Sequence, residues 1–90
     1  MDLQREFDKL TALLGKSPAG HAVAYDKWLD LAYLANELIQ DKPPWTRHTE
    51  TYGRVGFMAM AQDALDRKDY PTFMDVCINA AVWEAKRMKT

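Results

Sequence analysis

The chain of 90 residues carries 12 Lys and Arg against 13 Asp and Glu, a formal net charge of −1 at pH 7. This balance provides neither the overall basic field typical of proteins that coat nucleic acids nor a strongly acidic surface. A hydrophobic content of 48%, with 11% aromatic residues, excludes intrinsic disorder. The single cysteine excludes a disulfide framework and cysteine-rich zinc sites. We expect one soluble, cytoplasmic domain that has no membrane segment, because the longest apolar stretch, residues 55–61, is too short to cross a bilayer.

The first predicted helix covers residues 2–15. Asp2 is a good N-cap, and Gly15 is expected to end the helix as a C-terminal cap. Apolar residues recur between them at helical spacing and form a single stripe: Leu3, Phe7, Leu10 and Leu14.

The second predicted helix covers residues 18–41, from Ser17-Pro18 at its start to Pro43-Pro44 just after its end. Its expected buried face consists of Tyr25, Trp28, Leu31, Ala32, Ala35, Leu38 and Ile39. The opposite face is polar and carries Asp26, Asp30, Tyr33, Glu37 and Gln40, and the carboxylates on this side of the helix extend to Asp41. Two interpretations stay open for these carboxylates, a solvated helix face and a surface that meets a basic partner.

Two further helices are predicted over residues 47–67 and 71–88, separated by a short turn that ends in Pro71. No stretch of the chain alternates apolar and polar residues in the period of a strand. The sequence therefore predicts an all-α fold, a compact bundle of about four helices joined by short Pro/Gly turns.

The last two predicted helices are apolar around nearly their whole circumference in residues 55–61 and 76–83. Such helices must be covered on every side, either at the centre of a monomer or by a second copy of the chain. The candidate self-association residues are Phe57, Met58, Val76, Asn79 and Trp83. Asn79 would pair with its own copy in a homodimer, or with a backbone carbonyl, Tyr52 or Tyr70 in a monomer.

No residue pattern indicates catalysis. His21 and His48 lack a second ligand at the spacing that would let a helix share a metal ion. Cys77 lies among apolar residues and is expected to be buried and inert. We expect no catalytic residue, no metal ligand and no cofactor, and hence no enzyme.

Residues 43–54 concentrate the side chains that most often dominate binding: Trp45, Arg47, His48, Tyr52 and Arg54. They predict a small protein that acts by binding a partner protein as an adaptor, regulator or inhibitor, a format also found in phages and mobile elements. The alternative is a nucleic-acid or small-nucleotide binder that uses this segment and the basic C-terminus. A purely structural alternative also stays open, in which Trp45 folds back onto the bundle.

Overall fold

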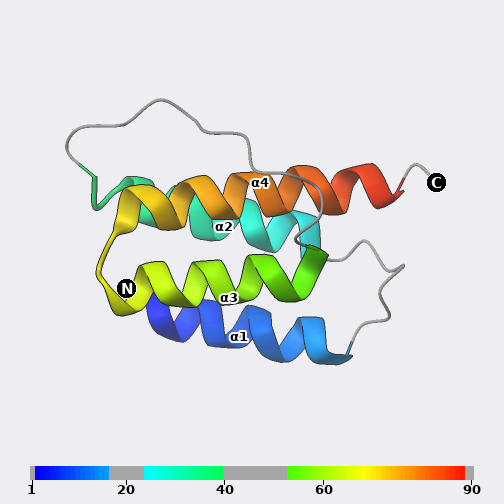
Figure 1. Ribbon diagram of the computed structural model, residues 1–90, viewed down its shortest axis with the longest axis horizontal. Coiled ribbons are helices and arrows are strands. Elements are labelled where there is room, and N and C mark those ends of the chain that lie inside the picture. Colours follow the sequence, from blue (N-terminus) through cyan, green and yellow to red (C-terminus); the bar gives the residue numbers. More distant parts are fainter. Residues whose placement is uncertain (1, 17–23, 40–52, 89–90) are drawn as a thin grey trace.

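A computed structural model of the chain describes residues 2–16, 24–39 and 53–88. These residues form four helices and contain no strand, which confirms the predicted all-α bundle (Figure 1). The helices are α1 (Leu3–Lys16), α2 (Ala24–Asn36), α3 (Gly53–Asp66) and α4 (Tyr70–Met88).

The longest helix, α4, packs against both α2 and α3, and α2 packs in turn against α1. In Figure 1, α2 and α4 lie above α1 and α3, and α2 and α3 run in the same direction. Both are antiparallel to α1 and α4. The starts of α2 and α3 therefore lie at one end of the bundle, together with the ends of α1 and α4.

The core centres on aromatic rings from three helices. Phe7 of α1 meets Phe73 of α4 edge-on at a centroid distance of 5.8 Å, and Trp28 of α2 at 6.2 Å. The described residues offer the buried Nε1 of Trp28 no hydrogen-bond acceptor. Fully buried alanines let the helices approach closely, and they come from α2, α3 and α4: Ala35, Ala61, Ala64, Ala80 and Ala81.

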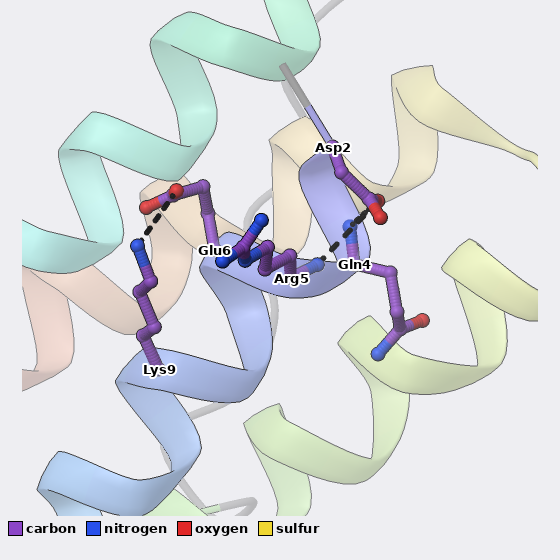
Figure 2. A network of polar contacts seen from close by, with 5 residues as sticks. All are labelled: Asp2, Gln4, Arg5, Glu6 and Lys9. Atoms are coloured by element: carbon purple, nitrogen blue, oxygen red, sulfur yellow. Dashed lines mark hydrogen bonds and ion pairs between the residues drawn. The ribbon is translucent and has the colours of Figure 1, made fainter.

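Helix α1 begins as predicted. One carboxylate oxygen of Asp2 accepts the backbone N–H of Gln4 at 3.0 Å and that of Arg5 at 3.5 Å (Figure 2). This N-cap satisfies donors that have no partner inside the helix. The end differs from the prediction, because the helix continues through Gly15 and finishes at Lys16.

Helix α2 ends at Asn36, five residues before the predicted end. The first part of the predicted helix, up to residue 23, lies outside the described part of the chain. Beyond Asn36 the backbone tightens: the N–H of Leu38 bonds to the carbonyl of Ala35 at 2.9 Å. This i→i+3 turn rotates Leu38 out of the helical register, so its side chain is 53% exposed. The predicted burial of Leu38 is therefore wrong.

The turn between α3 and α4 is built from backbone bonds. The N–H of Asp69 reaches the carbonyl of Ala64 at 2.8 Å and that of Lys68 reaches Leu65 at 3.0 Å, the pattern of a Schellman cap. Lys68 takes the left-handed conformation that glycine usually supplies here, with φ of 55°. Asp69 then caps α4, accepting the backbone N–H of Thr72 at 3.3 Å and its hydroxyl at 2.7 Å.

Candidate partner-binding surface

Arg54 is the one predicted partner-binding residue that lies in the described part of the chain, in the first turn of α3. Its side chain is 12% exposed and forms a two-pronged ion pair with Glu84 of α4, whose side chain is 1% exposed. The guanidinium donates from Nε to Oε1 at 2.6 Å and from Nη2 to Oε2 at 2.9 Å. Arg54 thus ties the start of α3 to the last third of α4. The other four predicted residues, Trp45, Arg47, His48 and Tyr52, lie outside the described residues.

Sequence reasoning missed Glu84. A signal for it exists, because Glu84 follows Cys77 and Ala80 on the same buried stripe of α4, at spacings of seven and four residues. A carboxylate on such a stripe needs a cationic or hydrogen-bonding partner. Which of the 12 basic residues meets it is not encoded in local spacing, since Arg54 is 30 residues away.

The candidate self-association residues are mostly interior to one chain. Phe57, Val76 and Asn79 are buried, whereas Met58 and Trp83 are half-buried. The Asn79 amide donates to the backbone carbonyl of Asp75 at 2.8 Å, one of the partners expected for a monomer. The burial of these three residues needs no second copy. Self-association stays a prediction, which sedimentation equilibrium tests by distinguishing the 10.4 kDa chain from a species of twice that mass.

The outward side of α2 carries the most distinctive exposed surface among the described residues. Asp26, Asp30, Tyr33 and Glu37 follow one another at helical spacing, and all four are exposed. We call these residues the acidic face. Tyr33 is 69% exposed, and the three carboxylates form no hydrogen bond or ion pair with any other described residue.

A groove between α1 and α2 borders the acidic face and has a volume of about 280 Å³. Its apolar lining combines the buried Leu10 and Leu31 with the half-buried Leu13 and Leu34. Its charged rim consists of Glu6, Lys9, Lys27 and Asp30. We call this feature the α1–α2 groove. Sequence reasoning could not find it, since its walls come from two helices whose relative position no local pattern fixes.

A second hollow lies between α1 and α3. It is lined by Phe7, Asp8, Thr11, Val55, Met58, Ala59 and Gln62. Val55 is 80% exposed there, and the side-chain amides of Gln4 and Gln62 bridge the two helices with bonds of 3.0 Å. This hollow carries fewer charges than the α1–α2 groove.

The described residues include one cysteine, Cys77, and several potential metal ligands. Cys77 is completely buried, as predicted, and desolvation raises the pKa of its thiol well above the ordinary value, so it stays protonated. No group of three or more His, Cys, Asp or Glu side chains converges on a common point in the described ranges. Within those ranges, too, none of the helices is both long enough and apolar enough to cross a membrane.

The chain matches no protein-family model, no curated protein and no solved structure.

Proposed function

We propose that the protein acts without catalysis, by binding a partner protein through the outward side of α2. The observation that carries this proposal is the exposure of Tyr33 at 69% between carboxylates of the acidic face. Tyrosine combines a large apolar body with a hydroxyl and loses little conformational entropy when it is fixed, so it is enriched among residues that dominate protein interfaces. In this role the protein would be a cytoplasmic adaptor, regulator or inhibitor, of the format that phages and mobile elements also use.

The energetics of α2 support the proposal. Asp26 and Asp30 are like charges one helical turn apart, which disfavours the helix by a few tenths of a kcal/mol at low salt. Glu37 lies where the helix dipole is negative, and no basic residue occupies the last turn of α2. Asp26 itself lies in the first turn, where the helix dipole favours a carboxylate, so the charges without a favourable place on this helix are Asp30 and Glu37, as expected where a partner supplies the compensating charge.

The alternative of nucleic-acid binding depends on the basic side chains of residues 43–54 and of the C-terminus. Arg54 already shares its guanidinium with the buried carboxylate of Glu84, and the acidic face would repel phosphate. We therefore favour a protein partner.

A capture experiment with matched variants tests the proposal. The wild-type chain, Tyr33→Ser and Val55→Ser are immobilised and exposed to a lysate of the organism that encodes the chain, with and without nuclease treatment. The retained proteins are compared by mass spectrometry. Val55 is the control because it is an even more exposed apolar residue on a different helix. We expect one protein to be retained by wild type and Val55→Ser and lost from Tyr33→Ser. Retention that is indifferent to Tyr33, or that disappears with nuclease treatment, would contradict the proposal.

A further inference from the structure

We propose that the α1–α2 groove binds an amphipathic helix of a partner protein, with the apolar side of that helix on the leucines of the groove and its basic flank against Asp30 and Glu37. This inference rests on the proposed function and specifies the surface and the chemistry of the partner.

The size of the groove indicates what it accommodates. A volume of about 280 Å³ lies just below the range of roughly 300–1,000 Å³ typical of sites for small molecules and cofactors. The groove is partly open to solvent between the two helices. These dimensions suit a few aliphatic side chains that project from a helix laid along it, the arrangement in which a helix binds in a groove through residues at i, i+3/i+4 and i+7.

The apolar surface continues beyond the groove along the same side of α2. Leu31 and Leu34 lie one turn apart on the groove side of α2, and Leu38 follows in the turn beyond Asn36, so the leucines become more exposed toward and past the end of the helix. Leu31 is 2% exposed, Leu34 is half-buried and Leu38 is 53% exposed.

The charges beside the groove determine the chemistry of the partner. On the α1 side, Glu6 and Lys9 pair with each other at 3.3 Å and neutralise that flank (Figure 2). On the α2 side the rim carries Lys27 and Asp30, and Asp30 also belongs to the acidic face, which adds the exposed carboxylates of Asp26 and Glu37 next to the groove. A basic flank on the partner would therefore be complementary, while an acidic flank, a nucleic-acid backbone or an anionic lipid surface would be repelled.

The other hollow serves as an internal comparison. Between α1 and α3, only Asp8 carries a charge among the lining residues, and its carboxylate already accepts a hydrogen bond from the side chain of Gln4 at 2.8 Å. The α1–α2 groove differs because its rim residue Asp30 belongs to the acidic face, whose carboxylates form no pair with any other described residue.

A defined peptide pair tests the inference. The probe is an 18-residue helical peptide with leucines along one face and lysines on both flanks, and the matched peptide has glutamates in place of the lysines. Binding is followed by fluorescence anisotropy at near-physiological salt. We expect the lysine peptide to bind at least about tenfold more tightly than the glutamate peptide.

Matched protein variants separate groove binding from general charge attraction. Asp30→Asn combined with Glu37→Gln is expected to weaken binding about tenfold, whereas Asp63→Asn combined with Asp66→Asn removes the same charge from α3 and should leave affinity within about twofold. Leu34→Ala keeps the charge and should also weaken binding. Circular dichroism melts of each variant establish that it remains folded.

Each remaining outcome overturns the inference. Equal weakening by both charge variants indicates non-specific attraction, and tighter binding of the glutamate peptide indicates the opposite partner chemistry. If the Asp30 and Glu37 substitutions change the sedimentation mass while the peptide does not bind, the groove is covered by a second copy. If the lysine peptide fails to bind but capture from lysate still depends on Tyr33, this inference falls and the proposed function stands.

Discussion

The polar residues of α4 and α2 are placed in opposite ways. Two polar residues of α4 are interior and matched: Glu84 meets Arg54 through two hydrogen bonds, and Asn79 donates to a backbone carbonyl. The carboxylates of α2 are exposed, and none of them pairs with another described residue. Glu84 and Asn79 of α4 therefore form hydrogen bonds that stabilise the fold, whereas the carboxylates of α2 form none with the other described residues.

The same contrast extends to the helix ends. Helix α4 begins with a carboxylate cap from Asp69, which accepts two hydrogen bonds from Thr72. Helix α2 ends at Asn36 without a base in its last turn, and Glu37 follows directly after it, against the preference of the helix dipole. Because charges on α2 are free of a structural role, substituting them should change binding and leave folding nearly intact. Substituting the polar groups of α4 should do the reverse.

The largest effect is expected at Glu84. Glu84→Ala leaves the Arg54 guanidinium largely buried without its carboxylate, and we expect the free energy of unfolding to fall by about 3–5 kcal/mol. Urea denaturation followed by circular dichroism measures the change. The double variant Arg54→Met with Glu84→Leu should recover much of the loss, since it removes both charges at once. A loss below about 1 kcal/mol for Glu84→Ala would show that α4 does not depend on this pair.

The next effect depends on pH and comes from Cys77. Burial raises the pKa of its thiol in the folded state, so above the ordinary thiol pKa the unfolded chain releases a proton that the folded chain retains. Stability should be independent of this group below about pH 8 and should fall by about 1.4 kcal/mol for each pH unit above about pH 9. Cys77→Ala should lose this component of the slope. Denaturation midpoints between pH 7 and pH 10 compare the two proteins, and identical slopes would contradict the assignment.

A smaller effect is expected at the start of α4. Asp69→Ala removes the acceptor of two hydrogen bonds from Thr72, and loss of such a cap costs about 1 kcal/mol. Asp69→Asn serves as the matched control, because asparagine also caps helices and keeps an acceptor oxygen without the charge. Thermal melts should therefore rank wild type and Asp69→Asn close together, with Asp69→Ala clearly below both.

The sequence was sufficient for features that depend on local order. Local order predicts the apolar stripe of α1 and its cap at Asp2, and it also predicts the burial of Cys77 on α4. The structure confirms all three. The predicted start of α4 at Pro71 lies one residue after the observed start at Tyr70, because proline is favoured in the first turn of a helix.

The features that sequence reasoning missed depend on contacts between elements. The Arg54–Glu84 pair joins residues 30 positions apart, and the α1–α2 groove exists only once two helices are packed. The exposure of Leu38 follows from an i→i+3 turn after Asn36, which helical periodicity alone does not reveal. Local spacing indicates which side chains need a partner or a cover, and the packed structure determines which ones receive it.

The smallest effect is the most direct test of the contrast between α2 and α4. Glu37→Lys replaces a charge that the dipole at the end of α2 disfavours with one that it favours, so the free energy of unfolding should rise by about 0.5 kcal/mol. The matched variant is Lys16→Glu, which reverses a favourable charge in the last turn of α1 and should lower stability by a similar amount. Both changes should shrink at 1 M salt, where exposed charges are screened within about 3 Å. Urea denaturation at low and high salt measures all four values. If Glu37→Lys instead destabilises the chain, then the acidic face supports the fold, and the structural argument for a partner on α2 loses its basis.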